Sequence, residues 1–154
     1  MESIDSTDIK ILRILQENSN ITTKELAQKV NLSSTPVFER VKQLEKKGYI
    51  KKYMAVLDEE KLNRGFIVFC NIKLKQHSKT YGQDFMKEIM GIDEITECYN
   101  ISGEFDFMVK VYVRDMKEYQ DFVLNRLGLI DSIGSLQSTF VMAETKHSYG
   151  IPVL

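Results

Sequence analysis

The stretch TTKELAQKVNLSSTPVFERVKQLEKKGYIKKY, residues 22–53, decides the fold of the first part of the chain. It predicts two short helices joined by a tight turn, and then a basic segment, 49–57, that alternates like a strand or wing. Gly48 ends the second helix in the position that favours a C-terminal glycine. Apolar side chains recur at helical spacing on one side of each helix: Leu26, Ala27 and Val30 in the first, and Val37, Val41 and Leu44 in the second. This pattern is typical of a helix-turn-helix.

Each helix start carries the same signal, which occurs three times in the first 40 residues. An apolar residue precedes a capping side chain, and another apolar residue follows four positions after the cap, as in a hydrophobic staple. Thr22 with Glu25 completes a capping box, and Pro36 falls in a first turn, where its missing N–H costs nothing. We therefore expect three helices, which begin near Ser6, Thr23 and Ser34.

The rest of the chain predicts strands and helices in the order β-α-β-β-α-β. This order is the signature of a ferredoxin-like αβ-sandwich. Helices cover one face of such a sheet, and the other face is also rich in apolar residues here, so we expect it to meet a second copy. The six segments are FIVFCNIKLK (66–75), YGQDFMKEIM (81–90), EITECYNIS (94–102), FDFMVKVYVR (105–114), MKEYQDFVLNRL (116–127) and SLQSTFVMAETK (135–146).

We thus predict an α+β protein in which residues 1–57 form a helix-turn-helix domain, 58–65 a linker with a short helix, and 66–154 the ferredoxin-like domain. No apolar run approaches the roughly 20 residues that span a bilayer. The N-terminus lacks the basic and apolar regions of a signal peptide, so we expect a cytoplasmic protein without a membrane partner. Cys70 and Cys98 lie in apolar segments and fit buried free thiols.

Charge is unevenly distributed along the chain. The formal net charge is −1, which alone argues against a nucleic-acid binder. Residues 22–53, however, hold eight lysines and arginines against three acids, so the remaining residues are net acidic. A basic patch on a nearly neutral protein is the electrostatic footprint that engages phosphates.

The second predicted helix carries side chains suited to DNA on the face opposite its apolar stripe. A recognition helix reads bases with its N-terminal half and holds phosphates with its basic end. Thr35, Glu39 and Gln43 are candidates for reading bases. Arg40, Lys42 and Lys46 are candidates for phosphates, and Arg40 also suits a guanine edge. The predicted DNA-binding surface comprises Ser34, Thr35, Pro36, Phe38, Glu39, Arg40, Lys42, Gln43 and Lys46.

Two alternatives remain for this helix. A solvated amphipathic helix with scattered lysines would carry a similar pattern, although the caps and the compact turn favour a DNA-reading element. Glu39 is awkward, because a carboxylate beside DNA repels phosphate. It would either accept from a cytosine amine or position Arg40.

The same residues resemble a known family, the Lrp/AsnC or feast/famine transcription regulators. The resemblance rests on IDSTDIKILRILQENS (4–19), residues 22–58, ECYNISGEFDFMVKVYV (97–113), YQDFVLNRL (119–127) and STFVMAETKHS (138–148), and it is greatest to the leucine-responsive branch. It covers nearly the whole chain. It implies a winged-type helix-turn-helix, a sandwich that dimerises through its sheet, dimers that assemble into octamers or similar rings, and an amino-acid effector bound between C-terminal domains.

The resemblance also places the family's effector-loop pattern, G-x-x-D, on Gly103 and Asp106. A glycine there allows a tight turn and a close approach to a ligand. Exposed N–H groups would hold an α-carboxylate, and Asp106 or Glu104 would meet an α-ammonium, although the same residues would also suit an ordinary hairpin turn. The predicted effector residues are Tyr99, Asn100, Ile101, Ser102, Gly103, Glu104 and Asp106, with Ser138 and Thr139 on the last strand. Leucine and methionine are the first guesses for the effector.

We therefore predict a sequence-specific DNA-binding transcriptional regulator, modulated by a free amino acid, which needs no cofactor and is not an enzyme. Its partners would be double-stranded DNA, the amino acid and further copies of itself. His77 and His147 have no acid or cysteine at metal-ligand spacing, and no phosphate loop or nucleophile elbow is present. The alternatives are a ligand-independent regulator that organises DNA and a protein–protein adaptor that docks through the N-terminal helices.

Overall fold

The computed structural model describes residues 4–153, which form two compact units. One unit contains the chain up to Val56 together with the segment from Thr145 onward, and the other is Leu57–Glu144. The final residues, which we expected in the C-terminal domain, therefore make their contacts in the N-terminal unit.

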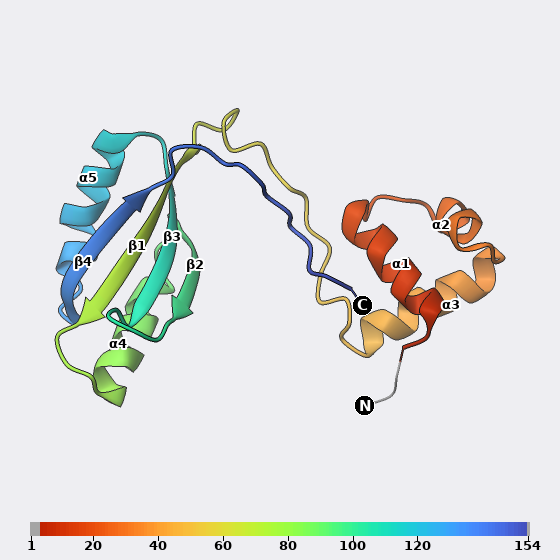
Figure 1. Cartoon of the computed structure of the whole chain (residues 1–154), viewed down its shortest axis with the longest axis horizontal. Coiled ribbons are helices and arrows are strands. Elements are labelled where there is room, and N and C mark those ends of the chain that lie inside the picture. The colour runs from red at the N-terminus through yellow and green to blue at the C-terminus, as the bar shows by residue number, and fades with distance from the viewer. Residues whose placement is uncertain (1–3, 154) are drawn as a thin grey trace. The chain divides into compact units, whose positions relative to one another are not determined.

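The first unit is built on three helices, α1 (Ser6–Glu17), α2 (Thr23–Val30) and α3 (Ser34–Lys46), which begin where the sequence predicts (Figure 1). Asp5 and Thr22 each accept a backbone N–H in a complete capping box, whereas Ser33 makes no side-chain cap. Asn31 ends α2 in the left-handed conformation, which shortens the turn before α3. The core between the helices consists of Ile11, Leu26, Ala27, Val30, Val37 and Leu44.

The segment after α3 differs from the prediction. Residues 49–57 contain no strand, because no neighbouring segment among the described residues supplies a ladder for them. Tyr53 still packs near α3, since its hydroxyl donates to Glu45 Oε1 over 2.9 Å. Burial, and then this bond to a carboxylate, raise the pKa of Tyr53 to about 12. The prediction of a short helix in the linker is also wrong, because residues 59–63 form turns only.

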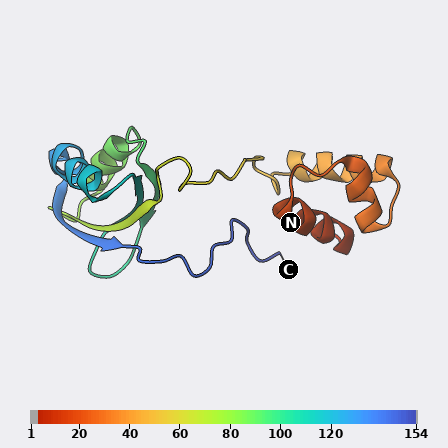
Figure 2. The ribbon, with the colours of Figure 1, turned by 90° about the horizontal axis from the view of Figure 1, so that it is seen from above.

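The second unit confirms the ferredoxin-like prediction. Its elements are β1 (Phe66–Leu74), α4 (Lys79–Ile89), β2 (Ile95–Asn100), β3 (Phe107–Val113), α5 (Met116–Asn125), a 3₁₀ turn (Leu127–Leu129) and β4 (Ile133–Phe140). The four strands form one antiparallel sheet in the order β2-β3-β1-β4. Both helices cover the same face of the sheet, as the two views show (Figures 1 and 2).

Alternation along the strands separates the two faces of this sheet. Alternate residues of β1 and β3, such as Val68 and Val109, are fully buried under the helices together with Phe85. The other face is more polar than expected, because Lys110 lies at its centre with only 8% of its surface exposed. Its Nζ is 3.6 Å from a carboxylate oxygen of Glu97 and 4.9 Å from the ring centroid of Tyr112.

Cys98 also differs from the prediction. Cys70 is buried as expected, but Cys98 is exposed. The reason is its position on β2, which is an edge strand of the sheet.

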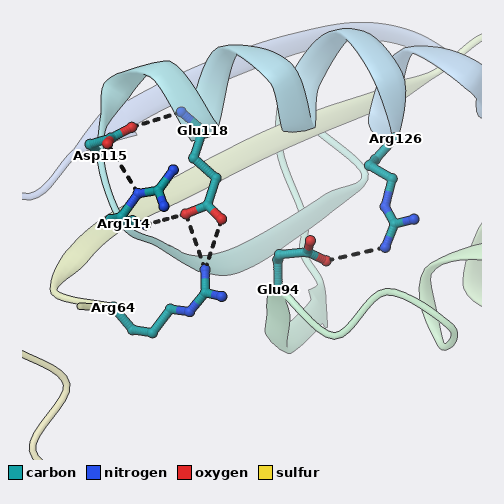
Figure 3. Close-up of polar contacts among 6 residues, drawn as sticks. All are labelled: Arg64, Glu94, Arg114, Asp115, Glu118 and Arg126. Atoms are coloured by element: carbon teal, nitrogen blue, oxygen red, sulfur yellow. Dashed lines mark hydrogen bonds and ion pairs between the residues drawn. The ribbon is translucent and has the colours of Figure 1, made fainter. Parts of the chain in front are cut away.

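Ion pairs fasten both ends of α5 to the surrounding chain (Figure 3). At its start, both carboxylate oxygens of Glu118 lie 3.0 Å from Nη1 of Arg64, and the same carboxylate accepts the backbone N–H of Arg114. At its end, Nη2 of Arg126 lies 3.6 Å from Oε2 of Glu94. Glu118 thus holds the end of the linker against the helix that covers the sheet.

Glu118 should make part of the stability depend on pH. Its pKa lies below the ordinary value, because its carboxylate accepts the Arg114 N–H and, to a smaller extent, pairs with Arg64. A group with a depressed pKa stabilises the fold above its unfolded pKa and loses this contribution as the pH falls through its folded pKa. We expect Glu118→Gln to lower the urea midpoint at pH 7, and the difference from the original protein to shrink below about pH 4.

Glu88→Gln is the matched control, because Glu88 is an exposed carboxylate on α4. It should leave the urea midpoint unchanged at both pH values. A deficit in the Glu118 variant that stays constant between pH 7 and pH 3 would contradict the assigned role of the carboxylate.

Candidate functional site

The outer face of α3 is open to solvent. Burial of Val37 and Leu44 turns one side of the helix into the core and leaves the other side free. Every predicted DNA-binding residue except Arg40 is exposed: Ser34, Thr35, Pro36, Phe38, Glu39, Lys42, Gln43 and Lys46. The structure therefore brings these eight residues onto one accessible helical surface.

The two lysines of this surface differ in their surroundings. Lys42 Nζ is 2.8 Å from Glu45 Oε2 and 5.7 Å from the centroid of the Phe38 ring. Lys46 lies in the last turn and makes no ion pair within residues 4–153. An exposed pair such as that of Lys42 contributes about 1 kcal/mol at most, so a phosphate can replace Glu45 at small cost.

Arg40 is held by α1 instead. Its Nη1 lies 2.6 Å from Asp5 Oδ2 and 2.8 Å from Asp8 Oδ1, and only 35% of its side chain is exposed. Both carboxylates raise the pKa of Arg40, Asp8 more than Asp5. Because Asp5 is also the cap of α1, the guanidinium joins the start of α1 to the middle of α3. This geometry gives Arg40 a positioning role within the chain, and its predicted contact with a phosphate or a guanine stays a prediction.

The predicted effector loop connects β2 to β3. The carbonyl of Asp106 accepts the backbone N–H of Ile101 and the side-chain amide of Asn100, both over 3.0 Å. Gly103 has φ +122°, a conformation that side-chain-bearing residues rarely adopt, and a Cβ placed on it would meet nothing within 4 Å. Ser102, Gly103 and Glu104 are exposed. The tip of the loop is thus open to solvent.

Asp106 ties this loop to the end of β1. Its Oδ2 accepts the backbone N–H of Leu74 over 2.8 Å, and its Oδ1 lies 2.8 Å from Nδ1 of His77. Local spacing does not predict this acid beside His77, because the two residues are far apart in the chain and meet only through the pairing of β1 with β3. A ligand ammonium at Asp106 would share or replace the His77 contact.

Ser138 and Thr139 do not join the loop within one chain. They lie on β4, at the opposite edge of the sheet from β2. Ser138 faces the helices, where its hydroxyl is 2.5 Å from that of Tyr119, which in turn lies 3.0 Å from Cys70 Sγ. Thr139 faces the other side of the sheet, opposite Phe69. The Tyr99 hydroxyl, on β2, donates to Glu97 Oε2 over 2.6 Å.

Comparison with known proteins identifies both units. Residues 4–51 match a winged helix-turn-helix DNA-binding domain, and residues 67–151 match the Lrp/AsnC ligand binding domain. The chain belongs to the Lrp/AsnC family of transcriptional regulators. It is a DNA-binding, ligand-modulated regulator, and the family resemblance of the sequence is confirmed.

Several Lrp/AsnC relatives match almost end to end. The Bkd operon transcriptional regulator of Pseudomonas aeruginosa is 36% identical over 92% of this chain and 93% of its own. The leucine-responsive regulatory protein of Haemophilus influenzae is 37% identical over 96% and 89%. A transcriptional regulator of Neisseria meningitidis, solved in complex with L-Met, superposes with a TM-score of 0.94 at 35% identity and covers 97% of both chains.

In residues 4–153, no group of three or more His, Cys, Asp or Glu side chains has the arrangement of a metal site. Within the same part of the chain, no helix is both long and apolar enough to cross a membrane.

Salt dependence should separate Arg40 from Lys46. The logarithm of DNA affinity falls with the logarithm of salt concentration by about 0.9 for each phosphate contact. We expect Lys46→Gln to reduce the magnitude of this slope by about 0.9, which corresponds to the loss of one phosphate contact. Arg40→Gln should leave the slope unchanged while lowering the thermal midpoint, because its loss leaves two carboxylates unpaired.

Lys10→Gln provides the control, since it removes an exposed lysine from α1 and should change neither the slope nor the midpoint. Fluorescence anisotropy on one DNA duplex at several salt concentrations gives the slopes. A reduced slope for Arg40→Gln at wild-type stability would return Arg40 to the phosphate contacts.

Proposed function

We propose that this protein reads DNA with α3 and changes its DNA affinity or its assembly when a free aliphatic amino acid, leucine or methionine, binds the loop between β2 and β3. The observation that carries the proposal is the open outer face of α3, which lies on a capped helix-turn-helix and holds two lysines and several polar side chains. Such a protein acts where the DNA is, so we keep the cytoplasm as its proposed location.

The DNA contacts divide along α3. Ser34, Thr35 and Pro36 lie in its first turn, and Glu39 and Gln43 follow further along the helix. Polar side chains in the first half of a recognition helix meet base edges, and basic side chains near its end meet the backbone. We assign Thr35, Glu39 and Gln43 to the bases and Lys42 and Lys46 to phosphates. With Arg40 bound to Asp5 and Asp8, Glu39 is free to accept from a cytosine amine.

The class of the effector follows from the loop and from two relatives. The N–H groups around Gly103 suit an α-carboxylate, and the carboxylates of Asp106 and Glu104 suit an α-ammonium. The Neisseria meningitidis relative was solved with L-Met, and the Haemophilus influenzae relative is named for its response to leucine. Both amino acids have flexible or branched aliphatic side chains of similar size. These observations support an aliphatic amino acid as the ligand.

A second copy would complete the site. The loop and the pair Ser138–Thr139 lie at opposite edges of one sheet. They come together only if β4 of one chain meets the loop of another. We therefore place the effector between C-terminal domains of neighbouring chains, in a ring of dimers for which an octamer is the size that the family resemblance implies.

Calorimetry with leucine and methionine tests the effector site. We expect the wild-type protein to bind at least one of them, and Asp106→Asn to weaken this binding by about tenfold or more, because a charge-assisted bond contributes about 1.5–3 kcal/mol. The amide can still accept the Leu74 N–H, so the loop should keep its conformation.

Asp93→Asn is the control for this measurement, since Asp93 is an exposed acid in a turn before β2 and should not affect binding. Equal affinities of Asp106→Asn and wild type would remove Asp106 from the site. No heat of binding with any amino acid would contradict the effector half of the proposal and favour a regulator whose C-terminal domain serves assembly alone.

A further inference from the structure

Residues 150–153 lie on the outer face of α1. The side-chain amide of Gln16 donates to the carbonyl of Ile151 over 2.8 Å and accepts the Ile151 N–H over 3.1 Å. Both Nε and Nη2 of Arg13 donate to the carbonyl of Val153, over 3.1 and 2.9 Å. Four hydrogen bonds from two side chains of one helix therefore hold a short extended segment, which we call the tail, residues 150–153.

The tail is recognised through its backbone. Gln16 pairs with the backbone N–H and carbonyl of Ile151, as a neighbouring strand would. The Ile151 residue remains 73% exposed. Gly150 makes the close approach possible, because a Cβ on this residue would lie 2.3 Å from Gln16 Nε2. Apolar burial therefore contributes little at Ile151, and polar contacts dominate the attachment.

The place of the tail in the chain gives this attachment a consequence. The chain passes from the first unit to the second between Val56 and Leu57, and it returns between Glu144 and Thr145, after β4. The four bonds to α1 fasten the returning segment to the helices close to its end. With them, the helices are attached to the second unit at two points of the chain, since α1 shares a core with α2 and α3.

We propose that residues 150–153 form a releasable tether, through which strand β4 of the ligand-binding unit restrains the DNA-binding helices and passes the effect of the bound amino acid to α3. The regulatory part of this inference rests on the proposed function. The tether itself does not. Exposed hydrogen bonds contribute little net free energy, so docked and released forms of the tail are close enough in free energy for a ligand to shift their populations.

Two variants should release the tail without touching either binding surface. In Gly150→Ala the new methyl group would collide with the Gln16 amide, which must move and lose its bonds to Ile151. Gln16→Ala removes the same bonds from the other side. The matched controls are Gly82→Ala, whose Cβ meets nothing within 4 Å, and Lys10→Ala, an exposed residue on the same helix as Gln16.

Time-resolved fluorescence anisotropy tests the tether without any effector. A dye on Lys24→Cys, an exposed position of α2, reports the motion of the helices once the exposed Cys98 is replaced by serine. We expect the fast component of the decay to grow in Gly150→Ala and Gln16→Ala and to match wild type in both controls. Identical decays in all five proteins would overturn the tether.

The regulatory part is tested by the ratio of DNA dissociation constants with and without the amino acid. If wild type shows a ratio different from one, Gly150→Ala and Gln16→Ala should bring it close to one, while their calorimetric affinity for the amino acid stays at the wild-type value. A ratio that stays at the wild-type value in both variants would overturn the transmission through the tail. A wild-type ratio of one would instead contradict the proposed function. The anisotropy decays would still show whether the tail restrains the helices.

Discussion

The burial of Val37 and Leu44 is the constraint on which the proposed DNA-binding surface depends. Both side chains are almost completely enclosed among α1, α2 and α3, and they fix the rotation of α3 about its own axis. Because a helix turns by about 100° per residue, Phe38, Glu39 and Lys42 then point away from this core. Arg40 reinforces this rotation through Asp5 and Asp8, so the cap of α1 and the orientation of α3 belong to one arrangement. The surface that we propose reads DNA is thus a consequence of apolar packing on its other side.

In the second unit, too, apolar packing decides which positions are exposed, here at every second residue of a strand. Alternate residues of β1 and β3 are buried under α4 and α5, which leaves the loops at the strand ends to carry function. Asp106 holds one such loop against the end of β1, and Gly103 gives it a backbone conformation that other residues rarely adopt. The other face of the sheet carries Lys110 among aromatic rings and beside Glu97, a mixed surface that suits pairing with a second copy better than exposure to water. Assembly and effector binding would then involve neighbouring parts of one sheet.

Local patterns made much of this fold predictable. Capping boxes specify the starts of α1 and α2, and the apolar stripe with Pro36 in the first turn indicates the start of α3, because these signals involve residues within a few positions of each other. The features that sequence reasoning missed all join distant residues: Arg40 with Asp5, His77 with Asp106, and Gln16 with Ile151. No local spacing encodes such contacts. The helix expected at the linker failed for another reason, since a polar segment without an apolar face has nothing to pack and forms turns instead.

The most direct test of the account is the affinity of the intact protein for the DNA upstream of its own gene, measured across a salt series with and without leucine or methionine. We predict specific binding that weakens steeply with salt, and an affinity or stoichiometry that changes when one of the two amino acids is added. Specific binding whose affinity and stoichiometry no amino acid changes would contradict the link between the loop and α3. The absence of specific binding at low salt would contradict the assignment of α3 as the reader.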